Sequence, residues 1–165
     1  MRFLLLAAML LVAPIAARAE GVRIERIDIV DTGIYTVETG EETPDPNAPT
    51  GTIAAVTTVT NIEATMAIPA KVGLEFGLRY VIVGEPAGAE VPLDFVITYP
   101  APGLVDPAEP TPLLKSRYSR DKKIGETVYL GYGFENDWEI VPGEWTFEIW
   151  YEGRKLASQT FRVTQ

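Results

Sequence analysis

The strongest constraint on the fold is a strict alternation of residue types close to the end of the chain. Residues 142–163 read PGEWTFEIWYEGRKLASQTFRV, and every odd position from Trp145 to Tyr151 is apolar. Successive side chains of a strand point to opposite faces of a sheet, so this pattern predicts a half-buried strand with an aromatic core face. Gly153 then provides a turn, and a second strand completes a β-hairpin.

The same period of two recurs earlier in the chain. Residues 71–83 place six apolar side chains on one face, and residues 91–99 and 126–134 alternate in the same way. Residues 22–31 alternate with a change of phase, which predicts a β-bulge near Glu25 and Arg26. The Thr- and Val-rich residues 52–62 are typical of a strand. Two turn-rich loops are expected at residues 39–51 and 100–112, the second because it carries five prolines.

These segments predict an all-β fold. Seven to nine short strands with Pro and Gly turns, and no amphipathic helix, favour a single antiparallel immunoglobulin-like β-sandwich. An outer-membrane barrel is the alternative. The mixed charges on the outer faces of the strands argue against a barrel, as does a chain end, Arg162 to Gln165, that lacks a terminal aromatic residue.

The first 19 residues have the pattern of a signal peptide. Arg2 precedes an apolar run, and the small residues Ala17 and Ala19 flank Arg18 before Glu20. A transmembrane anchor is the alternative, but the run is shorter than a spanning helix and Pro14 interrupts it. We therefore expect a cleaved signal peptide at 1–19, a β-sandwich domain at 20–165, a periplasmic or secreted location, and no transmembrane segment after cleavage.

Charge and missing residue types narrow the function. Loss of Arg2 and Arg18 changes the net charge from −9 to −11, which argues against a nucleic-acid partner. The sequence has no His and no Cys. This excludes Cys/His zinc sites, thiolate nucleophiles and Ser-His-Asp hydrolysis, and it leaves acid–base chemistry to carboxylates, Lys or Tyr. No cofactor is expected.

Carboxylates are the remaining candidates for catalysis or metal binding. Asp137 and Glu139 form a neighbouring pair, but a glycosidase needs two carboxyl groups set across a cleft, which such a pair does not indicate. Residues 39–51 hold several acids without the ordered spacing of a calcium loop, so a solvated surface loop is favoured there. The sequence therefore predicts a protein that is not an enzyme.

A basic run and a tryptophan on the outward face of its strand are the candidate partner contacts. Residues 115–123 concentrate five cations in an acidic chain, and Tyr118 among them offers a ring for stacking. The alternative is a solvated turn that balances nearby acids. Trp150 has the opposite parity to the core positions, so it faces outward, either exposed for a sugar ring or covered by residues 100–112. The candidate residues are Lys115, Arg117, Tyr118, Arg120, Lys122, Lys123 and Trp150.

Three segments resemble a family of exported bacterial proteins known as a domain of unknown function. They are FGLRYVIVG at residues 76–84, VITYP at 96–100, and the closing hairpin with its Pro-Gly-x-Trp-x-Phe start and Phe-x-Val end. The resemblance covers roughly residues 70–165. It implies an immunoglobulin-like β-sandwich and brings no activity, cofactor or catalytic residue.

The leading hypothesis from the sequence is an exported, non-catalytic binding module of the cell envelope. Its partner is a protein or a glycan of unknown identity. A carbohydrate-binding or envelope-glycan-binding domain is the alternative, and a small carboxylate-based hydrolase is a third hypothesis.

Overall fold

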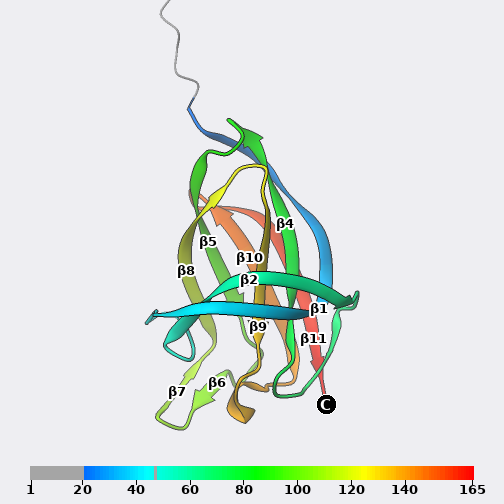
Figure 1. Cartoon of the computed structure of the whole chain (residues 1–165). Helices are drawn as coiled ribbons and strands as arrows, with labels where there is room; N and C mark the ends of the chain where they lie inside the picture. Colours follow the sequence, from blue (N-terminus) through cyan, green and yellow to red (C-terminus); the bar gives the residue numbers. More distant parts are fainter. Residues whose placement is uncertain (1–20, 47) are drawn as a thin grey trace, which may run out of the picture.

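The computed structural model describes residues 21–46 and 48–165 and shows two packed β-sheets (Figure 1). The expected signal peptide at 1–19 lies outside these residues. Sheet A contains, in spatial order, β2 (Thr52–Glu63), β1 (Arg23–Pro44), β4 (Glu75–Glu85) and β9 (Thr127–Gly133). Sheet B contains β3 (Ala67–Pro69), β11 (Arg154–Thr164), β10 (Gly143–Tyr151), β5 (Glu90–Thr98) and β8 (Lys115–Lys123).

Two smaller elements lie at one end of the sandwich. The strands β6 (Leu104–Asp106) and β7 (Glu109–Leu113) form a separate ribbon within the proline-rich segment, and η1 (Asp137–Glu139) is one turn of 3₁₀ helix. The two main sheets of the described chain hold nine strands, all paired antiparallel except β3 with β11. The expected β-sandwich is therefore confirmed.

The core is built around Phe76 of β4. Its ring lies within 5.7 Å, centroid to centroid, of four other aromatic rings and is fully buried. Phe147 and Phe161 come from sheet B, so these contacts join the two layers. The rings around Phe76 at this distance are Phe134, Trp145, Phe147 and Phe161.

The closing hairpin is confirmed as β10 and β11. Trp145, Phe147 and Ile149 are at most 1% exposed, and the indole N–H of Trp145 donates to the carbonyl of Val141 at 2.8 Å. Tyr151, expected in the core, is only half-buried because it ends the strand at the turn. The aromatic alternation therefore identified the core face correctly over three of its four positions.

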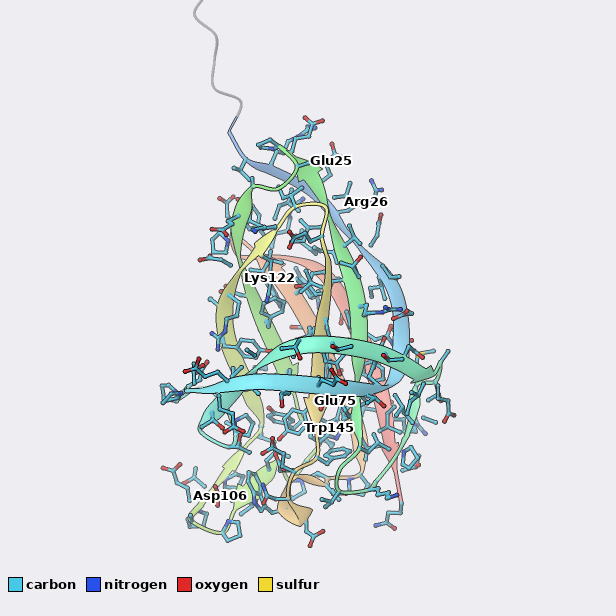
Figure 2. The ribbon with its side chains drawn as sticks, in the orientation of Figure 1. Glu25, Arg26, Glu75, Asp106, Lys122 and Trp145 are labelled. Atoms are coloured by element: carbon cyan, nitrogen blue, oxygen red, sulfur yellow. The ribbon has the colours of Figure 1, made fainter. Side chains whose placement is uncertain are left out.

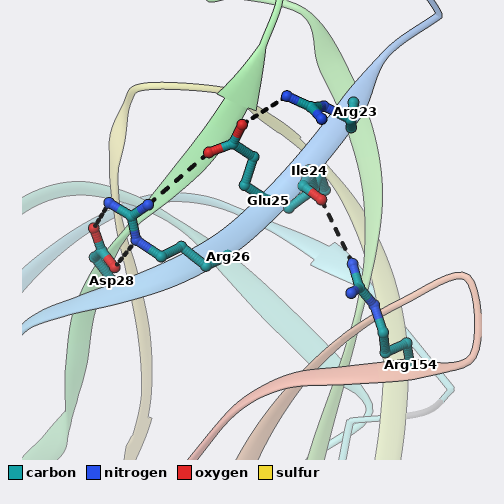
Figure 3. A network of polar contacts seen from close by, with 6 residues as sticks. All are labelled: Arg23, Ile24, Glu25, Arg26, Asp28 and Arg154. Atoms are coloured by element: carbon teal, nitrogen blue, oxygen red, sulfur yellow. Dashed lines mark hydrogen bonds and ion pairs between the residues drawn. The ribbon is translucent and has the colours of Figure 1, made fainter.

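The bulge expected in the first strand is also present. The register between β1 and β4 shifts between Ile24 and Arg26, so that Glu25 and Arg26 both become exposed. Figure 3 shows the result: Glu25 pairs with Arg23 at 2.7 Å, and Arg26 pairs with Asp28 at 2.8 Å. Such exposed pairs contribute little to stability, so this network is a surface feature.

Two strand boundaries differ from the sequence expectation. β4 begins at Glu75 rather than at residue 71, because Leu74 N–H bonds to the carbonyl of Lys71 in a turn, and Val72 is exposed. Residues 39–44 continue β1 instead of forming a loop. Pro92 stands near the start of β5, which lies inside sheet B between β10 and β8, so only the strand-start interpretation of this proline is correct.

Phe76→Ala tests this account of the core. The variant removes the ring that contacts both sheets, and we expect the free energy of unfolding to fall by about 3–5 kcal/mol. Chemical denaturation of both proteins measures the loss. Glu144→Ala, at an exposed position of β10, should change stability by less than about 1 kcal/mol. Similar losses in the two variants would contradict the assignment of the core.

Candidate functional site

A two-stranded arm crosses the outer face of sheet A. Its described residues are 36–46 and 48–63, which include the second half of β1 and the whole of β2, and these two strands pair antiparallel. The first half of β1 pairs with β4 instead, so one strand belongs to the sheet at one end and to the arm at the other. Figure 1 shows the arm running across β4 and β9.

Gly33 lies opposite Gly77 of β4, close to the end of the part of β1 that pairs with β4. Its φ is +149°, and a Cβ atom added there would lie 1.9 Å from the carbonyl oxygen of Glu63, at the end of β2. No side chain fits between two backbones at this distance, and L-residues rarely adopt this φ. A glycine at this position therefore allows the end of β2 to approach β1 closely, while β1 stays paired with β4 as far as Tyr35.

The tip of the arm is held to the other sheet by an ion pair. Asp45, which is 7% exposed, pairs with Arg120 of β8. The guanidinium of Arg120 also lies 5.2 Å from the centroid of the Tyr118 ring. β9 is the last strand of sheet A and β8 the last strand of sheet B. The arm thus bridges the open side of the sandwich between these two edges.

Between the arm and the sandwich lies a cleft of about 960 Å³, called here the arm cleft. This volume is typical of ligand sites. Figure 2 places Glu75 where the arm crosses sheet A, and Lys122 farther along β8. The walls come from the arm and from both sheets, and they include Val37, Ala54, Glu75, Tyr118, Lys122 and Tyr129.

The main polar group of the arm cleft is the pair Glu75 and Tyr129. The Tyr129 hydroxyl donates to Glu75 Oε1 at 2.9 Å. Both side chains lie flat along β9: a Cβ at Gly131 would fall 1.8 Å from the Tyr129 hydroxyl oxygen, and a Cβ at Gly133 would fall 2.3 Å from Glu75 Oε2. The two glycines therefore leave the space that this pair occupies.

Burial raises the pKa of Glu75 to about 7, and the charge of Glu135 adds to this shift, while the bond from Tyr129 opposes it. The carboxyl group thus changes its charge near neutral pH.

Tyr129 is held in place by a second group of side chains. The ring of Tyr35 packs edge to face against it, with the centroids 5.0 Å apart. The Tyr35 hydroxyl donates to Asp31 at 2.6 Å, and Arg79 Nε donates to the same carboxylate at 3.0 Å. The bond from Arg79 lowers the pKa of Asp31, and burial raises the pKa of Tyr35 to about 12. This group therefore consists of a neutralised ion pair and a ring that fixes the position of Tyr129.

Lys122 is a half-buried cation of the arm cleft. Burial lowers its pKa, and the nearby charge of Arg120 lowers it further. Within the described part of the chain, no hydrogen bond or ion pair reaches its ammonium group, whereas Arg120 beside it is paired. Lys122 thus offers a charge to a ligand.

The basic run is an edge strand rather than a turn, and it divides between two surfaces. Lys115 and Arg117 lie on the outer face of sheet B, whereas Tyr118, Arg120 and Lys122 line the arm cleft. Lys123 is exposed at the margin of the cleft. An edge strand with cationic side chains resists pairing with other chains, which gives the run a structural reason.

Trp150 lies on the outer face of sheet B, opposite Asp94 in the β-ladder. It is half-buried, its indole N–H donates to Glu148 at 3.0 Å, and Lys155 Nζ lies 5.7 Å from its ring centroid. The proline-rich loop does not cover it, because Pro100 contacts Gly143 at the other end of β10. The interpretation of a loop-covered Trp150 is therefore wrong.

Sequence reasoning missed Glu75 and Tyr129. Both sit on the polar face of an alternating strand, which normally faces solvent. The glycines on that face were the available signal. Gly77 of β4 admits the backbone of β9 closely, because a Cβ there would lie 2.3 Å from the Leu130 carbonyl oxygen.

No group of three or more potential metal ligands occurs among residues 21–46 and 48–165. No helix of the same residues is long and apolar enough to cross a membrane.

The two packed sheets and their connections define the class as an immunoglobulin-like β-sandwich protein. The solved structure of an immunoglobulin-like protein (PA1606) from Pseudomonas aeruginosa is similar to this chain, with a TM-score of 0.55 and 27% identity over 90% of this chain and 100% of that one. Residues 23–163 match the family described as Domain of unknown function (DUF3859), and the chain belongs to that family. The membership in a family of unknown function expected from the sequence is therefore confirmed. A comparison with curated proteins finds no match.

Arg120→Met tests how the arm is held. The variant keeps the aliphatic bulk of the side chain but removes the ion pair with Asp45, so we expect cleavage in the turn at residues 46–51 to become about 5-fold faster. Limited proteolysis with mass spectrometry measures the rate. Arg117→Met is the control: it changes another arginine of β8 and removes an exposed pair with Asp94 of β5. It should leave the cleavage rate unchanged. Equal rates in all three proteins would show that the pair does not hold the arm.

Glu75→Gln tests the buried carboxyl group. A raised folded-state pKa means that folded Glu75 keeps a proton between pH 4.5 and 7 that the unfolded chain has lost. Its contribution to the free energy of unfolding therefore falls as pH rises through this window and is constant above it. As the pH rises from 4.5 to 7, we expect the free energy of unfolding of Glu75→Gln to increase by about 2 kcal/mol relative to that of the parent protein. Urea denaturation at several pH values measures the difference.

Glu144→Gln, at an exposed site, is the control and should follow the parent protein at every pH. A constant difference between Glu75→Gln and the parent protein would contradict the burial of an ionisable carboxyl group.

Proposed function

We propose that this protein is an exported, non-catalytic binding module of the cell envelope and that its ligand occupies the arm cleft. Export rests on the signal-peptide pattern of residues 1–19. The intact mass of the protein from a periplasmic fraction checks this part, because cleavage after Ala19 leaves a chain that begins at Glu20. A full-length mass would contradict it.

The observation that carries the proposal is the cleft itself. Immunoglobulin-like sandwiches bury their apolar faces between two sheets, and nothing in that packing requires an arm held away from the surface. Here the arm encloses about 960 Å³ together with a half-buried carboxyl group and a half-buried ammonium group. The Lys122 ammonium group and Glu75 Oε2 accept or donate no hydrogen bond within the described residues, and half-buried polar atoms of this kind favour a ligand or ordered water as their partner.

Two considerations argue against catalysis in this cleft. The sequence contains no His or Cys. In a carboxylate-based hydrolase the environments of two carboxyl groups separate their pKa values, so that one is an acid and the other a base. Here burial raises the pKa of both Glu75 and Glu135, and each is shifted in the same direction. The two therefore lack the division of roles that hydrolysis needs.

The aromatic rings argue against a sugar as the first choice of ligand. Sugar binding by stacking needs a free ring face. The Tyr118 ring lies 5.5 Å from Phe95, with Arg120 5.2 Å from its centroid, and Lys155 lies near the Trp150 ring. These neighbours contact the Tyr118 ring from two residues and occupy one face of the Trp150 ring. A glycan ligand remains the second hypothesis, and the experiment below separates the two.

Parallel binding screens test the proposal. The purified protein is applied to an array of extended peptides and to an array of envelope glycans, and titration calorimetry measures the affinity of the strongest ligand. Ala54→Trp places a large ring in the arm cleft from β2, and we expect it to weaken binding at least about tenfold.

Thr58→Trp is the matched control, because this exposed residue of β2 is outside the cleft lining. It should bind like the parent protein. If Ala54→Trp binds the ligand with unchanged affinity, the ligand does not occupy the arm cleft. The absence of any ligand on either array, or turnover of a substrate, would overturn the proposed function.

A further inference from the structure

The arm cleft follows the edge of β9 rather than one of its faces. A cavity against a face of a strand touches every second residue, because side chains alternate. The cleft lining contains all seven residues of β9, from Thr127 to Gly133. From β1, in contrast, it takes only alternate positions between Val37 and Thr43. The open space therefore lies along the free edge of β9.

That edge presents unpaired backbone groups. Phe134 N–H donates to the carbonyl of Leu74 at 3.0 Å, which sets the hydrogen-bonding parity of the β4–β9 ladder. The N–H and C=O groups of Tyr129, Gly131 and Gly133 therefore point away from β4. Among the described residues, none forms a hydrogen bond to these groups from the cleft side. A row of free donors and acceptors on a sheet edge is the template for another strand.

The edges of the two sheets differ in protection. β8, at the edge of sheet B, carries the outward charges of Lys115, Arg117 and Lys123, which discourage strand pairing. β9 reads TVYLGYG and has no charged residue. Its protection is the arm that passes over it. An uncharged edge inside a cleft is suited to a strand of limited length.

Glu75 gives this edge a chemical preference. Its Oε2 atom lies over Gly133, 2.3 Å from the place of a Cβ, and therefore near the residue that would pair with Gly133 on an added strand. Tyr129 occupies Oε1 and holds the carboxyl group in this position. The free oxygen suits an ammonium or guanidinium group. The protein is also acidic overall, which attracts a cationic segment.

We propose that the arm cleft binds an extended, basic segment of a partner polypeptide by strand addition to β9, with a Lys or Arg side chain opposite Gly133 paired with Glu75. The inference rests on the proposed function and names the class of its partner. Backbone bonds to the edge provide affinity, and the carboxyl group provides sequence preference. Gly131 and Gly133 let the added backbone approach because they carry no side chain.

A displayed library of random peptides about ten residues long tests the proposal, because such a chain spans the whole edge of β9 at ~3.3 Å per residue. The strongest binder is synthesised and added to the ¹⁵N-labelled protein. We expect amide exchange at Tyr129, Gly131 and Gly133 to slow at least about tenfold. We also expect Lys or Arg to be enriched at one peptide position.

Two variants test the role of Glu75. Glu75→Gln should weaken the basic peptide about tenfold and leave a version with Gln in place of the basic residue unaffected. Glu144→Gln, on the outer face of sheet B, should bind both peptides like the parent protein. Equal affinities of the parent protein for the two peptides would overturn the assignment of Glu75.

The remaining outcomes separate this inference from the proposed function. A peptide that instead slows exchange along β2 or β8, or a glycan that binds in place of any peptide, overturns strand addition to β9 and keeps a binding module. Slow exchange at the three β9 amides in the free protein shows that the edge is already covered and overturns the inference. No binding of peptides or glycans overturns both.

Discussion

The aromatic contacts of Phe76 are the interaction on which the rest of the structure depends. This ring contacts Phe147 and Phe161 of sheet B at 5.5 and 5.4 Å while its own strand belongs to sheet A. Burial of large rings is the main source of stability in a chain without disulfides. The core joins the two sheets, and the arm closes over its open side, where core residues such as Phe95 and Leu130 line the cleft.

The arm is less stable by itself than the sandwich, and it therefore needs attachments to the rest of the fold. An isolated two-stranded ribbon is only marginally stable in water. Here it is continuous with sheet A through β1, its strand β2 ends close against Gly33, and its tip is fixed by Asp45 and Arg120. The cleft beneath it combines an uncharged strand edge with a carboxyl group that Tyr129 orients. A sandwich edge of this kind is a hazard when exposed and a binding surface when shielded.

Much of the fold could be predicted from local pattern. The bulge at Ile24–Arg26, the closing hairpin and the inward face of β4 from Phe76 onward all follow from alternation, which one chain segment carries by itself. The end of β1 could not be predicted, because residues 39–44 are polar and gain their strand form only by pairing with β2. The basic residues were correctly identified as a cluster, but their division between two surfaces depends on the strand parity of β8.

The sequence by itself determined the all-β class, the core aromatic residues and the absence of imidazole and thiol chemistry. The alternation of apolar and polar residues is visible within each strand, and the missing residue types are visible in the composition. The tertiary structure alone decided where Glu75 lies. Its strand pattern marks it as solvent-facing, and only the arm, folded back from residues far away in the chain, buries it beside Tyr129 and over Gly133. Burial of a polar face depends on what another part of the chain places above it, and no local pattern contains that information.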